Sequence, residues 1–245
     1  MSQAPLLGDS RFWTRAEDRQ RAVNALFDGG AAHYDRVCSV MSFGSGQRYR
    51  RRALAQAGLT QGHRVLDVGT GTGLLAREIA HTIESAGRVV GVDPSVHMMC
   101  AGRARLSIPL VQGVGESLPF RDAAFDFVTM GYALRHVPDL GAAFAEYRRV
   151  LKPGGRVVLL EITKPASALG AAIVRGYFGA IVPMLARLTT GSADAARMMD
   201  FYWETIDHCV PPETVMQSLA DAGFDDARRD VEAGIFSAYT GRRAQ

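Results

Sequence analysis

The chain has 245 residues, which suits one α/β domain with an interior large enough for a real core. Its hydrophobic content of 47% and charged content of 22% are ordinary for a soluble globular protein, and its net charge of +3 is too small to indicate a nucleic-acid partner. Three cysteines (Cys38, Cys100 and Cys209) are too widely spaced to indicate a disulfide framework or a metal motif, so we predict no metal.

Signs of export or membrane insertion are also lacking. The amino terminus has no charged stretch followed by an apolar stretch, as a signal peptide would have. The most apolar segment, residues 166–188, is interrupted by Arg175 and Pro183, so we expect no membrane-spanning helix. Because the cysteine usage also agrees with a reducing compartment, we predict a cytoplasmic protein.

In chain order, residues 1–26 form a polar, arginine-rich amino-terminal arm, and residues 27–245 form a single domain. Short apolar runs bounded by turn residues predict strands at 65–68, 88–92, 109–112, 125–130, 156–160, 224–230 and 235–240. Helical patterns occur at 74–83, 140–151 and 211–223, the second of them ending at Lys152-Pro153-Gly154-Gly155. This alternation predicts an α/β fold with a doubly wound, mostly parallel, seven-stranded sheet and an antiparallel C-terminal strand.

Two segments do not fit the alternation. Residues 162–211 are too long for a simple crossover and are rich in methionine and aromatic residues, so we expect a helical lid inserted over an apolar aromatic acceptor. The alternative is ordinary packing of extra helices. Arginines are dense over Arg48–Arg52, where the simplest interpretation is a solvated helix face. Contact with an anionic substrate, or with lipid headgroups at the inner face of a membrane, is the alternative there.

The strand ending at Val68 runs directly into Gly69-Thr70-Gly71-Thr72-Gly73, and the next strand is followed by Asp93. Alternating glycines let the backbone turn sharply and approach a ligand, and an acid after the second strand suits a ribose diol. Asp67, inside the first strand, would not help a pyrophosphate but suits a ligand that carries an ammonium and a sulfonium. The pattern therefore favours S-adenosylmethionine over a nicotinamide dinucleotide, although Gly71–Ala76 also matches G-x-G-x-x-A.

Further motifs follow one another in order between Phe27 and Arg242. They are Phe27-Asp28, Tyr34-Asp35, Met41-Ser42-Phe43-Gly44, Gly115-Glu116-Ser117-Leu118-Pro119-Phe120, Leu134-Arg135, Arg149–Gly155 and Glu161…Lys164-Pro165. Together they resemble the ubiquinone/menaquinone-biosynthesis C-methyltransferases, a family of class I, Rossmann-like enzymes. The resemblance implies C-methylation of a demethylated quinol, with S-adenosylmethionine as donor and S-adenosylhomocysteine as product. Peripheral contact with a membrane and a homodimer stay open.

The resemblance also implies roles for the cofactor site. The three glycines of the turn would pass beneath the cofactor, Asp93 would hold its ribose, and Tyr34 would close over its amino-acid tail. Glu116 and backbone groups would hold the adenine. The predicted cofactor-binding set is Tyr34, Asp67, Gly69, Thr70, Gly71, Gly73, Asp93, Pro94, Gly115 and Glu116.

The predicted catalytic pair is Arg135 and His136, where the family usually has Arg-Asn. The pKa of an arginine is too high for a base, so Arg135 would stabilise a phenolate or orient water. His136 is the better base, because neutral imidazole is available near pH 7. Other departures from the family pattern are Cys38, Ser39, Gly46, Tyr49, Val114, Met199 and Phe201. They leave open a different acceptor, an aromatic or polyketide-like natural-product ring methylated at carbon, oxygen or nitrogen. Separate alternatives are a nicotinamide oxidoreductase and a non-catalytic subunit.

Overall fold

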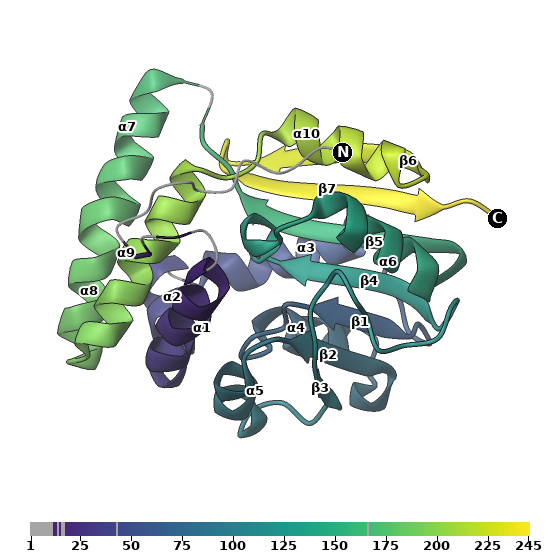
Figure 1. Ribbon diagram of the computed structural model, residues 1–245, viewed down its shortest axis with the longest axis horizontal. Helices are drawn as coiled ribbons and strands as arrows, with labels where there is room; N and C mark the ends of the chain where they lie inside the picture. Colours follow the sequence, from purple (N-terminus) through teal and green to yellow (C-terminus); the bar gives the residue numbers. More distant parts are fainter. Residues whose placement is uncertain (1–11, 14, 16–17, 43, 166) are drawn as a thin grey trace.

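A single mixed sheet organises the molecule. The computed structural model describes residues 12–13, 15, 18–42, 44–165 and 167–245 (Figure 1). In this part of the chain, seven strands form one sheet in the order β3-β2-β1-β4-β5-β7-β6. The strands are β1 (Val65–Val68), β2 (Val89–Asp93), β3 (Leu110–Gln112), β4 (Phe125–Gly131), β5 (Leu151–Ile162), β6 (Phe224–Glu232) and β7 (Phe236–Arg243). Neighbours from β3 to β5 are parallel and β7 is antiparallel to both of its neighbours, so the predicted fold is confirmed.

Helices cover both faces of this sheet. On one face, α3 (Ser45–Gln56) and α4 (Leu74–Thr82) enclose a core that includes Val65 and Val158. On the other, α6 (Leu140–Val150) and α10 (Pro212–Asp221) pack over Leu66 and Leu159. Successive residues of β1 thus enter opposite cores, as the alternation of side chains along a strand requires.

The strand order places a ligand crevice beside β1. The chain builds outward from β1 to β2 and β3, and then returns to pair β4 on the other side of β1. The connections on the two sides lead away from each other, which leaves a crevice at the carboxyl ends of these strands. Of the remaining elements near this end, α5 (Val96–Arg103) follows β2, and the short helix η4 (Leu134–His136) follows β4.

A second group of helices forms a cap beside the sheet (Figure 1). This helical cap consists of α1 (Arg19–Gly30), η2 (Ala31–His33), α2 (Tyr34–Ser42), α7 (Ala168–Gly176), η5 (Tyr177–Ile181), α8 (Val182–Thr190) and α9 (Ala193–Asp207). The predicted boundary at residue 27 falls inside α1, where Val23 is buried with Trp13 and Phe201. Residues 1–11, 14, 16 and 17 of the predicted arm, Phe43 and Ala166 lie outside the described residues.

The expected interruption of the apolar segment at Arg175 and Pro183 is wrong, because α7, η5 and α8 follow one another as one helical run. Proline removes one backbone donor and crowds the carbonyl four residues earlier. Here η5 is a π-helical turn in which Val182 N–H bonds to Tyr177 O. The backbone hydrogen bond there spans five residues instead of four, just before the proline. Among the described residues, this run, Ala168–Thr190, is the one helix long and apolar enough to cross a membrane by length and composition.

Candidate active site

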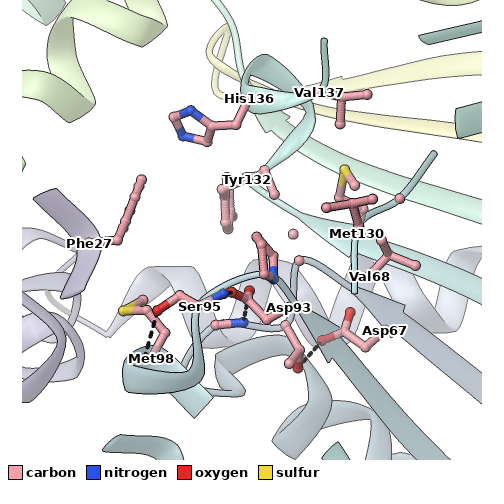
Figure 2. Close-up of a pocket in the computed structure, with 18 of the residues that line it drawn as sticks. Phe27, Asp67, Val68, Asp93, Ser95, Met98, Met130, Tyr132, His136 and Val137 are labelled. Atoms are coloured by element: carbon pink, nitrogen blue, oxygen red, sulfur yellow. Dashed lines mark hydrogen bonds between the residues drawn. The ribbon is translucent and has the colours of Figure 1, made fainter. Parts of the chain in front are cut away.

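A cavity of about 560 Å³ lies at the carboxyl ends of β1, β2 and β4 (Figure 2). This volume is within the range of small-molecule and cofactor sites. Nine predicted cofactor residues line it: Tyr34, Asp67, Gly69, Thr70, Gly71, Asp93, Pro94, Gly115 and Glu116. His136 lines it too, whereas Gly73 and Arg135 do not. The strand-end motifs and the distant tyrosine of α2 are thus brought together in one place.

The glycine turn between β1 and α4 has a backbone that other residues would strain. Gly69 has a φ of +66°, and Gly73 has a φ of +82°. A Cβ on Gly73 would lie 2.2 Å from Leu106 Cδ2. Gly73 is therefore needed for the close packing of the turn against Leu106 and does not itself line the cavity. Thr72 Oγ1 donates to Asp35 Oδ1 at 2.5 Å, which ties the turn to α2.

Two buried carboxylates lie at the strand ends. Asp67 accepts hydrogen bonds from Thr70 Oγ1 at 2.8 Å and Thr129 Oγ1 at 2.7 Å. Asp93 accepts from the backbone N–H groups of Gly71 at 2.7 Å and Ser95 at 2.8 Å. Burial raises the pKa of each carboxyl group from its ordinary value of 3.8 to about 6, and the hydrogen bonds offset only part of this shift. This end of the cavity therefore favours a ligand that brings positive charge or hydroxyl donors.

Arg50 is a cavity residue that the sequence analysis missed. Among the described residues lining the cavity it is the single lysine or arginine, and its Cζ lies 5.4 Å from the centroid of the Tyr132 ring. Its neighbours in the arginine run behave as the favoured interpretation predicted: Arg51 and Arg52 are exposed and pair with Glu78 and Glu232. The available signal was spacing, because position 50 follows the buried Gly46 by four residues and so lies on the inner side of α3.

The opposite end of the cavity is apolar and aromatic. Phe27 of α1 faces His136 there, and their ring centroids are 5.3 Å apart in an edge-to-face arrangement (Figure 2). On its other side, the His136 ring stacks on Phe201 of α9 with centroids 5.7 Å apart. Within the described chain, α1 and Tyr34 are the parts of the helical cap that line the cavity, and α7, η5, α8 and α9 pack behind them. The imidazole is thus held between two phenyl rings at the wall of the cavity.

Arg135 points away from the cavity into the seam between β5 and α9. It forms a buried ion pair with Glu161, and its Nε donates to Thr205 Oγ1 at 2.9 Å. Its Cζ lies 4.2 Å from the centroid of the Tyr202 ring. Burial is the strongest single influence and acts to lower the pKa of Arg135, but the Glu161 carboxylate together with Tyr202 and Cys209 outweighs burial, and the pKa is raised. Arg135 therefore stays charged and is a structural partner of Glu161 in this arrangement.

Among the described residues, no group of three or more His, Cys, Asp or Glu side chains could hold a metal ion. The chemistry offered by the cavity comes from its carboxylates, its arginine, its tyrosines and one imidazole. The prediction that no metal is used stays a prediction.

Comparison with known proteins adds a family to this geometry. The model of the ubiE/COQ5 methyltransferase family matches residues 14–243. The ubiquinone/menaquinone biosynthesis C-methyltransferase UbiE of Francisella philomiragia is 34% identical over 233 residues, which cover 92% of each chain. UbiE of Shewanella piezotolerans is 33% identical over 234 residues, again with 92% of each chain covered.

Solved structures share the fold at lower identity. A SAM-dependent methyltransferase of Thermotoga maritima, described as a possible histamine N-methyltransferase, has a TM-score of 0.63 at 21% identity. The match covers 90% of this chain and 99% of that one. Phosphoethanolamine N-methyltransferase 2 of Haemonchus contortus, in complex with S-adenosyl-L-methionine, has a TM-score of 0.60 at 14% identity, with 93% and 59% covered.

Proposed function

Because this chain belongs to the ubiE/COQ5 methyltransferase family, we propose that it methylates a ring carbon of a demethylated quinol. The enzyme is an S-adenosylmethionine-dependent methyltransferase. The observation that carries the quinol proposal is the division of one cavity into a polar end with two carboxylates and an aromatic end with one imidazole. A cytoplasmic location and a homodimer stay predictions, and contact with a membrane is argued separately below.

The polar end suits the cofactor in its donor set. Asp93 would accept hydrogen bonds from the ribose hydroxyls, and Asp67 and Tyr34 would face the ammonium of the amino-acid tail. We assign Arg50 to the carboxylate of that tail, because a guanidinium matches a carboxylate in shape and charge. Glu116, with Thr70, Pro94 and Gly115, would enclose the adenosine. When bound there, S-adenosylmethionine supplies an electrophilic methyl group.

The aromatic end suits the acceptor. Phe27, Met130 and Val137 offer apolar contacts to a ring, and His136 lies among them as the titratable group (Figure 2). We assign His136 to removing the proton of a ring hydroxyl, which pushes electron density onto the neighbouring carbon. Arg135 is then a positioning residue: its backbone N–H and side chain both bond to Glu161, which holds η4 and therefore His136 in place.

The test is transfer of radiolabelled methyl to a panel of reduced demethylquinols and soluble phenols. Label on a quinol ring carbon is the expected result. Label only on a soluble aromatic would overturn the quinol proposal and move the enzyme to natural-product rings. Absence of label from every acceptor, together with binding of NAD but not of S-adenosylhomocysteine, would overturn the methyltransferase reading as well.

One substitution tests His136 as the base without changing the proposed cofactor-binding residues. His136→Asn places the family's usual residue at this position and removes the imidazole. We expect kcat to fall by about 10²- to 10⁴-fold, because a general base contributes that much, with affinity for S-adenosylhomocysteine unchanged. His208→Asn is the matched control, since His208 is exposed at the end of α9. An unchanged kcat in His136→Asn would show that another group removes the proton.

A further inference from the structure

The helical run α7–η5–α8 is apolar on its outer face as well as on its inner one. Leu169 and Leu188 are each 73% exposed, and Ile173 is 63% exposed. Ile181 and Met184 are also exposed on the same run. A helix that is hydrophobic all round is normally buried, yet only 17% of the most apolar window of this one is buried. An exposed apolar surface of this kind marks a site of interaction.

The inner face shows that the run lies along the protein and does not leave it. Val174, Phe178, Val182 and Ala186 are buried against α2 and α9. Tyr177 Oη donates to Met41 O at 2.6 Å, and Phe178 stacks on Trp203 with centroids 6.4 Å apart. Crossing a bilayer would break these contacts on one side of the helix. In Figure 1 the run forms the outer edge of the helical cap, on the side away from the sheet.

The charges along the run distinguish a lipid surface from a second copy of the chain. Residues 167–190 contain Arg175 and Arg187 and no aspartate or glutamate. Arg36 adds a further cation at the far end, where its Nη1 donates to Thr189 O at 3.2 Å. The nearby Asp207 carboxylate of α9 is shared between Lys164 at 3.0 Å and Arg175 at 4.0 Å, so it does not offset the positive charge of this face. In a two-fold dimer the same patch would meet itself and bring this net positive charge together. Anionic lipid headgroups complement the same charges.

We propose that α7–η5–α8 is a membrane-docking helix that lies in the interface of an anionic bilayer. Its exposed side chains, Leu169, Ile173, Ile181, Met184 and Leu188, enter the boundary between headgroups and acyl chains. Arg175 and Arg187 remain at the level of the phosphates, as long basic side chains do at interfaces. The inference is independent of which ring the enzyme methylates, because it rests on the surface of the cap and not on the cavity.

The experiment is co-sedimentation of the full chain with vesicles of phosphatidylcholine alone and of phosphatidylcholine mixed with phosphatidylglycerol. We expect binding to the anionic vesicles that weakens with salt. Combining Leu169→Ser, Ile173→Ser and Leu188→Ser should lower the partition coefficient at least about a hundredfold, because each large aliphatic side chain contributes when it is buried. Arg175→Gln with Arg187→Gln should lower it about ten- to thirtyfold on anionic vesicles only.

The matched control is Val231→Ser, which removes another half-exposed aliphatic side chain from β6, outside the cap. All variants should bind S-adenosylhomocysteine as the unmodified chain does, since none of these residues lines the cavity. Failure to sediment with either vesicle, or equal sedimentation of the triple serine variant, would overturn the proposal. A dimer in analytical ultracentrifugation that dissociates only in the triple serine variant would assign this face to a second copy instead.

Discussion

Buried carboxylates are held in different ways in two regions. One is the polar end of the cavity, which contains Asp67 and Asp93 and is called the cofactor end after its proposed ligand, and the other is the seam behind the aromatic end. Asp67 and Asp93 are 1% and 7% exposed, and their hydrogen bonds come from hydroxyl and backbone N–H groups. Glu161 is also fully buried, but it is ion-paired with Arg135. The first two carboxylates can therefore still gain a cation or hydroxyl donors from a ligand, whereas the third is already paired with a cation within the fold.

This difference distinguishes carboxylates that are suited to ligand binding, Asp67 and Asp93, from one that stabilises the fold, Glu161. A ligand that brings a cation or hydroxyl donors to an acid whose pKa is raised by burial favours the ionised form of that acid, so we expect Asp67 and Asp93 to couple ligand binding to proton release. An acid already paired with arginine gains little from a ligand. Its loss would instead strand a buried guanidinium between β5 and α9.

Breaking the buried ion pair should have the largest effect on stability. Glu161→Gln keeps the shape of the side chain but leaves Arg135 charged and buried. We expect the free energy of unfolding to fall by about 3–5 kcal/mol, measured by urea denaturation. Asp67→Asn is the contrasting variant, because its partners among the described residues are the hydroxyls of Thr70 and Thr129 and not a cation, and we expect a change below about 1.5 kcal/mol there. Equal losses in the two variants would contradict the distinction between the two regions.

Asp35 joins helix α2 of the helical cap to the glycine turn and should have the next largest effect. Its carboxylate accepts from Thr72 of the glycine turn and pairs with Arg77 at 3.1 Å and Arg105 at 3.0 Å. We expect Asp35→Asn to lower the free energy of unfolding by about 1.5–3 kcal/mol, as hydrogen bonds to charged groups do. The control is Asp18→Asn, whose ion pair with Arg21 is exposed and should contribute about 0–1 kcal/mol. If the two variants lose the same amount, the cap is not held to the turn by Asp35.

The pH dependence of cofactor affinity tests the cofactor end alone. Burial raises the pKa of Asp67 and Asp93 to about 6, so the free folded protein holds protons on them that the unfolded chain has lost. Stability of the free protein therefore falls as pH rises from about 4 to about 6, because the native state binds more protons. Ligand binding favours the ionised form, so affinity for S-adenosylhomocysteine should rise with pH and level off above about 6.

We expect the dissociation constant to decrease at least about tenfold between about pH 5 and about pH 7. Calorimetry in two buffers of different ionisation enthalpy would also show protons released on binding near pH 6. Asp67→Asn should leave only the contribution of Asp93 and so reduce the proton release. An affinity independent of pH over this range would show that the two acids are not coupled to the ligand.

Local sequence signals predicted which residues meet at the polar end of the cavity. The turn at Gly69–Gly73 and the acid after β2 lie within one β–α–β unit, so spacing alone placed Asp93 beside the glycines. The aromatic end depends on contacts between distant segments. Phe27 and Phe201 meet His136 from helices far away in the chain, and the proline at 183 was absorbed by a π-helical turn that no composition rule indicates. Arg50 was hidden in a run of surface arginines.

The smallest predicted effect concerns two serines that cap the amino termini of helices, Ser95 near the cofactor end and Ser192 at the start of α9. Ser95 begins α5: its Oγ accepts from Met98 N–H at 3.0 Å and donates to Asp28 Oδ1 of α1 at 2.5 Å. Ser192 begins α9, and its Oγ accepts from Ala195 N–H at 3.2 Å. Removing either cap should cost about 1 kcal/mol of unfolding free energy. Only Ser95→Ala should also weaken S-adenosylhomocysteine binding, and by less than about tenfold, because the Ser95 backbone N–H still holds Asp93. Titration calorimetry on Ser95→Ala and Ser192→Ala would measure the two affinities. An equal loss of affinity in both variants would show that the helical cap and the cofactor end respond as one unit.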